Sequence, residues 1–199
     1  MKHSANIEEL LQLQVDYIGF IFYKPSPRYV GESLTDVLEG WGGVNKVGVF
    51  VDEPISEVFM KIQQYDLDAV QLHGKETPEI CQQLKEKNVC VIKSFSLSNE
   101  NDLTSVGKYT EVCDYFLFDT TTPQYGGSGR KFDWKILQHY HSNIPFFLSG
   151  GISPNDIETI RSFQHPSLYA IDLNSRFEIS PGFKDINKLK NFIQLIYSK

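Results

Sequence analysis

The sequence predicts a parallel α/β fold and, among such folds, a (β/α)8 barrel without its first strand. Seven short apolar runs alternate with amphipathic segments along the 199 residues, as in a parallel sheet that is covered on both faces. One more amphipathic segment precedes the first run, so we expect seven strands and eight helices. Element order alone also allows an open doubly wound sheet, but that fold gives no reason for an opening helix without a strand.

The elements follow one another with recognisable boundaries. The opening helix starts near Ser4, a suitable cap, and places Ile7, Leu10 and Leu11 on one face. The seven expected strands are 17–22, 46–50, 69–72, 89–95, 115–118, 145–148 and 169–173. Helix starts are marked by Pro54, Thr77-Pro78, Asp133 before Trp134, and Ser153-Pro154, and the last helix is expected over 185–197. With no linker or repeat to divide it, residues 1–199 are expected to form a single domain.

Composition narrows the classes of partner. A formal net charge of -6 argues against nucleic acid and anionic membranes, because both are bound through clustered Lys and Arg. No apolar run is long enough for a membrane span and the first residues do not resemble a signal peptide, so we expect a cytoplasmic protein with a small-molecule partner. Cys81, Cys90 and Cys113 show no metal-ligand spacing, and we expect buried free thiols, no metal and no cofactor.

A barrel carries its working residues where strands end and the following loops begin, which defines the candidate positions. The polar or flexible residues at these positions are Lys24, Ser26, Arg28, Asp52, Gln71, His73, Lys93, Ser94, Asp119, Thr120 to Thr122, Ser149, Gly150, Gly151, Asp172, Asn174, Ser175 and Arg176.

Two of these loops are suited to phosphate. Gly150 and Gly151 precede a Ser-Pro helix start, where backbone N–H groups and the helix dipole favour an anion. Taken alone, a Gly pair after a strand is more often a tight turn. Barrels often bind phosphate between the loops of their last two strands, and Asn174 and Ser175 supply the second loop.

Three side chains are candidates for the chemistry. Asp119 follows an apolar strand, where desolvation favours the protonated form of a general acid, although a capping Asp is the alternative. Arg28, in KPSPRYV, is suited to bidentate capture of a carboxylate, or it is a surface Arg. His73 is at least as consistent with a structural role as with catalysis. Gly126 and Gly127 lie in a Gly-rich loop that is long enough to cover a ligand or to serve as a flexible connector.

The residues resemble the phosphoribosylanthranilate isomerase family of tryptophan biosynthesis over essentially the whole chain. The motifs in the family's order are GFIFYKPSPRYV (19–30), KVGVFVDEP (46–54), DAVQLHGKETPE (68–79), VIKSF (91–95), FLFDT (116–120), YGGSGRKFDW (125–134), LSGGISPNDI (148–157) and PGFKD (181–185). Each motif is common in α/β proteins, but the joint match in order and spacing is specific.

The resemblance implies a cofactor-free Amadori rearrangement of N-(5-phosphoribosyl)anthranilate to 1-(2-carboxyphenylamino)-1-deoxyribulose 5-phosphate. An acid opens the ribose ring to a Schiff base, and a base removes the C2 proton to give an enolamine that becomes the ketone. By matching motif, Asp119 is the general acid and Arg28 holds the carboxylate. The resemblance places Gly150, Gly151, Asn174 and Ser175 around the phosphate, and His73, Asp172, Gly126 and Gly127 elsewhere in the pocket.

The chain departs from the family at its start. The family opens with a K-x-C-G strand whose Cys is the general base, and Met1 stands where the residue after Cys-Gly would be. We therefore expect that the natural protein extends upstream, that the chain as written is catalytically impaired, and that an open seam separates the strands at Tyr17 and Tyr169. The general-base Cys is absent, since none of the three cysteines stands at the end of a strand.

Two other functions remain open. Another phosphosugar barrel, such as indole-glycerol-phosphate synthase or a pentose-phosphate epimerase, would share the phosphate loops, but KPSPRYV and the FDT and YGGSG motifs argue against it. A non-catalytic phosphosugar-binding barrel is compatible with the missing base. The sequence is compatible with a monomer or a homodimer.

Overall fold

Seven parallel strands form one curled sheet in the computed structural model, which describes residues 1–31, 41, 43–120 and 133–198. The strands are β1 (Tyr17–Ile21), β2 (Asn45–Phe50), β3 (Ala69–Leu72), β4 (Cys90–Leu97), β5 (Tyr115–Thr120), β6 (Phe146–Leu148) and β7 (Leu168–Ile171). Their order in space is their order along the chain, and every neighbouring pair is parallel. The seven predicted strands and the (β/α)8-type architecture are confirmed.

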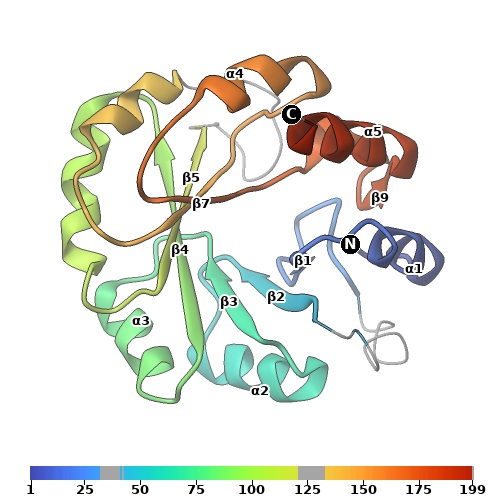
Figure 1. Ribbon diagram of the computed structural model, residues 1–199. Helices are drawn as coiled ribbons and strands as arrows, with labels where there is room; N and C mark the ends of the chain where they lie inside the picture. The colour runs from blue at the N-terminus through green and yellow to red at the C-terminus, as the bar shows by residue number, and fades with distance from the viewer. Residues whose placement is uncertain (32–40, 42, 121–132, 199) are drawn as a thin grey trace.

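Helices cover the convex side of the sheet (Figure 1). They are α1 (Ser4–Leu11), α2 (Ile55–Tyr65), α3 (Pro78–Lys85), η2 (Glu100–Tyr109), η3 (Trp134–His139), η4 (Pro154–Asp156) running into α4 (Ile157–Ser162), and α5 (Ile186–Tyr197). Between β1 and β2, where the eighth helix was expected, residues 32–40 and 42 lie outside the described residues. In η2 the hydroxyl groups of Thr104 and Ser105 donate to carbonyls three residues back, which favours the tighter 3-10 geometry.

The helix starts follow the capping residues that the sequence indicated. Thr77 caps α3 with Pro78 at its first position, and Asp185 accepts the Lys188 N–H at the start of α5. The first helix is the exception, because Ser4 is its first residue and His3 is its cap. His3 takes the extended cap conformation and packs its ring on Phe183, at 5.3 Å between ring centroids.

Two hydrophobic clusters show that the sheet is curled into a barrel. The larger cluster lies between the sheet and the helices and includes Phe20, Phe116 and Phe146. The smaller cluster, formed by Val47, Ala69, Ile92, Leu117 and Phe147, comes from the alternate residues of five strands. Because side chains alternate between the two faces of a strand, this second cluster is the packed interior of the barrel.

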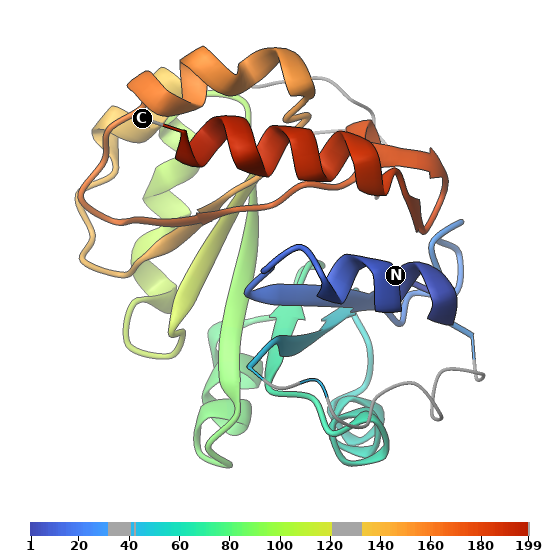
Figure 2. The same cartoon turned by 45° about the vertical axis from the view of Figure 1, so that its right-hand side comes forward.

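The barrel has an open seam at the expected place. β1 and β7 form the two edges of the sheet, and across the gap the Tyr17 and Tyr169 hydroxyls are 3.1 Å apart. The Met1 nitrogen donates to the Gly19 carbonyl at 2.7 Å, so residue 1 lies against β1. Helices α1 and α5, from opposite ends of the sequence, lie side by side next to this seam (Figures 1 and 2).

A short antiparallel hairpin follows β7 and was not predicted. It pairs β8 (Glu178–Ser180) with β9 (Phe183–Lys184) through a turn in which Gly182 has φ of 82°. This hairpin brings Glu178 and Lys184 next to the carboxyl ends of the strands. Within the part of the chain that the structure describes, no helix is long and apolar enough to cross a membrane.

Candidate active site

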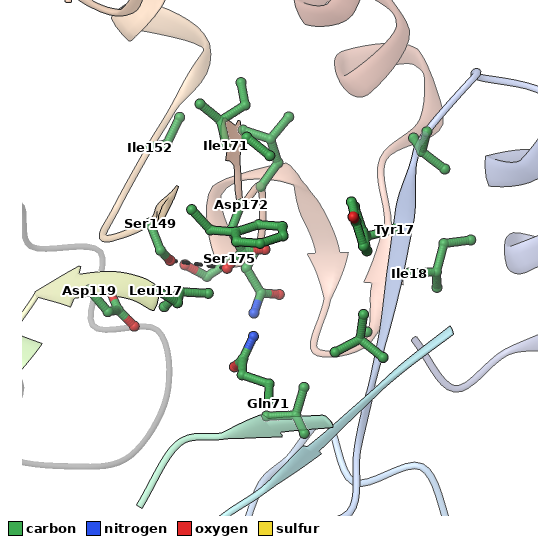
Figure 3. Close-up of a pocket in the computed structure, with 18 of the residues that line it drawn as sticks. Tyr17, Ile18, Gln71, Leu117, Asp119, Ser149, Ile152, Ile171, Asp172 and Ser175 are labelled. Carbon is green, nitrogen blue, oxygen red and sulfur yellow. Dashed lines mark hydrogen bonds between the residues drawn. The ribbon is translucent and has the colours of Figure 1, made fainter. Parts of the chain in front are cut away.

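A cavity of about 360 Å³ reaches the carboxyl ends of the strands, takes lining residues from all seven and extends along the seam to α1 and α5. Figure 3 shows part of its lining. The apolar residues Val47, Ile92, Leu117 and Phe147 form its floor. Its polar lining residues include Ser26, Arg28, Gln71, His73, Ser96, Asp119, Thr120, Ser149, Asp172, Asn174, Ser175, Glu178 and Lys184. Strand alternation explains part of this arrangement, because Asp119 and Ser149 stand two positions beyond the floor residues Leu117 and Phe147.

Asp119 lies at the end of β5 above this apolar floor. Burial raises its pKa to about 6, and the negative charge of Asp172 acts in the same direction. The Thr120 N–H donates to Asp119 Oδ1 at 2.7 Å and partly opposes the shift. A carboxyl group with this pKa gives up and takes back a proton near neutral pH, as a general acid requires.

His73 faces Asp119 from the end of β3. Its Nδ1 lies 2.9 Å from Gln71 Oε1, which only accepts, so Nδ1 carries the proton and Nε2 the lone pair. Burial lowers the pKa of His73, and the positive charge of Lys93 lowers it further, which favours the neutral ring. His73 Nε2 stands 3.7 Å from Asp119 Oδ2, close enough for the two groups to share a bound ligand.

The loop after β6 packs directly against Asp119. Gly150 and Gly151 have φ of 91° and 72°, a backbone conformation that residues with a side chain rarely adopt. A Cβ atom at Gly150 would lie 2.5 Å from Thr120 Oγ1 and 3.3 Å from Asp119 Oδ1. Ser149 donates to Asp172 Oδ2 at 3.0 Å and connects this loop to the end of β7 (Figure 3).

The loop after β7 is held by Lys184 of the hairpin. Lys184 Nζ donates to the Leu173 carbonyl at 2.9 Å and to Asn174 Oδ1 at 3.0 Å. Asn174 and Ser175 both line the cavity, as Gly150 and Gly151 do, and the strands that precede the two loops, β6 and β7, are paired. The two predicted phosphate loops are therefore neighbours at the mouth of one cavity.

Arg28 lines the cavity but is already bound to a carboxylate of the protein. Its Nε donates to Glu178 Oε1 and Oε2 at 3.1 and 2.9 Å, and its Nη2 lies 2.8 Å from Oε2. Both side chains are buried, with 11% of Arg28 and 4% of Glu178 exposed. Sequence reasoning missed Glu178 and Lys184 because they come from a hairpin beyond the strand end, and the PGFK turn was their only signal.

Several candidate positions lie elsewhere. Lys24, Asp52, Lys93, Ser94 and Arg176 do not line the cavity. Lys93 points to the outside of the sheet, where its Nζ lies 3.0 Å from Glu76 Oε2 and donates to the Leu72 and Gly74 carbonyls. Thr121, Thr122, Gly126 and Gly127 fall outside the described residues. None of the three cysteines lines the cavity.

The fold and this cavity define a class of protein: a (β/α)8-type barrel enzyme with a carboxylic acid over an apolar floor and basic side chains nearby. A family model described as N-(5'phosphoribosyl)anthranilate (PRA) isomerase matches residues 1–195. The chain therefore belongs to the N-(5'-phosphoribosyl)anthranilate isomerase family, whose members act in tryptophan biosynthesis.

Individual relatives agree with this assignment. The chain is 47% identical over 199 residues to the N-(5'-phosphoribosyl)anthranilate isomerase of Parabacteroides distasonis, with 98% of this chain and 90% of the relative covered. It is 44% identical over 201 residues to that of Phocaeicola vulgatus, covering 98% and 97%.

Solved structures of the family share the fold. Phosphoribosyl anthranilate isomerase from Thermotoga maritima has a TM-score of 0.86 at 33% identity, with 98% of this chain and 95% of that chain covered. A second structure, with a TM-score of 0.84, 30% identity and coverage of 98% and 94%, is a complex with reduced 1-(o-carboxyphenylamino)-1-deoxyribulose 5-phosphate.

Proposed function

We propose that the cavity binds N-(5-phosphoribosyl)anthranilate and that Asp119 is the general acid of its Amadori rearrangement. The observation that carries this proposal is the raised pKa of Asp119, about 6, above an apolar floor. An acid at this position protonates the ring oxygen as the C1–O bond breaks, and the nitrogen lone pair forms the Schiff base. The neutral ring of His73 faces the same space, and its Nε2 is placed to accept a hydrogen bond from the ligand.

The two ends of the substrate meet different groups in this proposal. The phosphate lies between the loops of Gly150 and Gly151 and of Asn174 and Ser175, where glycine backbone amides approach it without a side chain between. The anthranilate carboxylate lies at Arg28, whose planar guanidinium matches a carboxylate. Asp172, bound to Ser149, contributes a negative charge that raises the pKa of the acid. Gly126 and Gly127 as a covering loop stay a prediction.

None of the three cysteines lines the cavity, so none of them is placed to act as the base of the reaction. Loss of a positioned acid or base typically costs about 10² to 10⁴ in rate, so the expected impairment of this chain stays a prediction. The test is isomerase activity, followed by loss of phosphoribosylanthranilate fluorescence, beside a version extended upstream with a K-x-C-G strand. Activity in the extended version alone supports the expectation, and equal activity in both contradicts it.

The role of Asp119 is tested in whichever version is active. Asp119→Asn should lower kcat about 10² to 10⁴-fold while the protein still binds reduced 1-(o-carboxyphenylamino)-1-deoxyribulose 5-phosphate, because the amide keeps the shape but cannot donate an acidic proton. A matched control is Asp102→Asn, which changes an Asp in η2 away from the cavity and should leave kcat unchanged. Full activity of Asp119→Asn would exclude Asp119 as the general acid.

A non-catalytic phosphosugar-binding barrel is the alternative prediction from the sequence, and turnover separates it from an isomerase. If the protein only binds, reduced 1-(o-carboxyphenylamino)-1-deoxyribulose 5-phosphate should raise its melting temperature, because binding stabilises the folded state whether or not a reaction follows. Neither the chain as given nor the extended version should then turn over substrate. The cytoplasmic location, the single domain and the choice between monomer and homodimer also stay predictions. One relative with a solved structure, from Thermotoga maritima, is described as dimeric.

A further inference from the structure

The ion pair between Arg28 and Glu178 fixes the plane of the guanidinium group. Glu178 is contacted by Nε and Nη2, which together form one of the two edges of a guanidinium that match a carboxylate. The second edge, formed by Nη1 and Nη2, then has a defined direction. An Arg without such a partner would have to lose the freedom of a long side chain when it binds a ligand.

Glu178 is itself held from two sides within the hairpin. The Gly182 N–H donates to its Oε1 at 3.2 Å, and Lys184 Nζ lies 3.5 Å from the same atom. Although burial alone would raise it, the pKa of Glu178 is lowered by the hydrogen bond from Arg28 and by the charges of Lys184 and Arg28. Glu178 is therefore a fixed negative charge, and its side chain is only 4% exposed.

Lys184 connects this ion pair to the loop after β7. Its Nζ also donates to the Leu173 carbonyl and to Asn174 Oδ1, and its side chain is 10% exposed. The Asn6 side chain binds both the N–H and the carbonyl of Lys184 and fixes its backbone. Arg28, Glu178, Lys184 and Asn174 thus form one chain of contacts between the two ends of the proposed substrate site.

We propose that Glu178 is a positioning residue, which turns the second edge of Arg28 toward the carboxylate of the substrate, with Lys184 holding Glu178 in place. This proposal rests on the proposed function, because it takes Arg28 as the group that binds the carboxylate. Glu178 acts through Arg28 and does not touch the substrate.

A purely electrostatic role for Glu178 predicts the opposite effect. If Glu178 only reduced the positive charge near the carboxylate, its removal would leave Arg28 and Lys184 without a counter-charge and would strengthen carboxylate binding. If Glu178 sets the direction of Arg28, its removal weakens carboxylate binding despite the added positive charge. The sign of the change therefore separates the two roles.

The test compares two probes by calorimetry: reduced 1-(o-carboxyphenylamino)-1-deoxyribulose 5-phosphate and the same compound without its carboxylate. The unchanged protein should prefer the first by about tenfold or more, as expected for a charge-assisted hydrogen bond. Glu178→Gln keeps the shape and should reduce this preference to about threefold or less, whereas the affinity for the second probe should change little. A loss of protein stability alone would weaken the binding of both probes equally.

Three further variants complete the experiment. Arg28→Ala should abolish the preference, and adding Glu178→Gln to it should change nothing more. Glu76→Gln is the matched control, because Glu76 is equally buried and paired with Lys93 but does not line the cavity, and its variant should keep the full preference. If circular dichroism shows that Glu178→Gln does not fold, Glu178→Asp, with a carboxylate one methylene shorter, tests the same prediction.

The outcomes are distinguishable. If the wild-type protein binds both probes equally well, Arg28 does not bind the carboxylate, and the function proposed for that residue fails. A preference that persists or grows in Glu178→Gln overturns the positioning role alone. A preference that falls in Glu178→Gln and persists in Glu76→Gln supports it.

Discussion

Replacing the proposed general acid should stabilise the protein at neutral and alkaline pH. Burial raises the pKa of Asp119 from 3.8 to about 6, so that the folded state holds its proton more tightly than the unfolded state does. Stability is therefore lost as the pH rises from about 4 to about 6, because ionising this group is harder in the folded protein. Asp119→Asn removes that cost, since the amide does not ionise.

The size of the effect follows from the shift. One pKa unit corresponds to about 1.4 kcal/mol, so the shift of roughly two units sets an upper value of about 3 kcal/mol. The side chain of Asp119 is 27% exposed, and solvent screens part of its interactions. We expect Asp119→Asn to gain about 1 to 3 kcal/mol at pH 7.5 and to gain progressively less as the pH approaches 4.

Urea unfolding between pH 4 and pH 8, followed by circular dichroism, measures this difference. The control is Asp102→Asn, whose wild-type carboxylate caps η2 and has the opposite shift: although burial opposes it, hydrogen bonds from Ser98 and Asn99 lower the pKa of Asp102. Asp102→Asn should therefore destabilise the protein at pH 7.5, and its effect should shrink as the pH falls. If Asp119→Asn is destabilising at pH 7.5, or its effect does not depend on pH, the reasoning about Asp119 is refuted.

Three more predictions concern the surroundings of the acid. Glu76→Gln should cost about 3 to 5 kcal/mol in urea unfolding because Lys93 keeps a buried charge without its partner, and a loss below about 1 kcal/mol would contradict this. Gly150→Ala should cost more than about 1 kcal/mol, since φ is 91° and the new Cβ meets Thr120; unchanged unfolding would show that the loop relaxes freely. His73 should protonate below its ordinary pKa in a titration by nuclear magnetic resonance, and Lys93→Met should raise that pKa.

Much of the barrel could be predicted because buried parallel strands leave a clear signal. Runs such as YFLF are apolar at every position, since one face packs on helices and the other on the barrel interior. The predicted run at 115–118 became β5, which extends to Thr120 and so includes Asp119 in the strand itself. The polar ends of strands are harder to assign, because side chains point inward only at every second position.

Lys93 shows this difficulty. It follows Ile92, which lies on the floor of the cavity, so its own side chain points to the opposite face and pairs with Glu76. By the same rule, Ser149 follows Phe147 by two residues and lines the cavity. Strand ends alone therefore suggest too many candidates; the inward register removes Lys93, whereas Ser94, two positions after Ile92, has the inward register but does not line the cavity.

The partner of Arg28 could not have been found from local sequence. Glu178 is 150 residues away, in a hairpin whose strands have three and two residues and no periodic pattern. An ion pair between such distant positions depends on how the hairpin after β7 packs near the start of the chain, which is a property of the tertiary structure. The Pro-Gly turn at 181–182 indicates only that the chain reverses.

The pairing of Arg28 with Glu178 also helps to explain how one small cavity can hold both an acid and basic groups. Anions are bound by positive charge, but uncompensated positive charge near Asp119 would lower its pKa and favour the ionised form. Arg28 and Lys184 share Glu178 as a counter-ion, and the charge that acts on Asp119 besides burial is the negative charge of Asp172. In the proposed function, the cavity thus combines directed donors for a carboxylate on one side with an acid of raised pKa on the other, because Glu178 of the hairpin offsets part of the positive charge of Arg28 and Lys184.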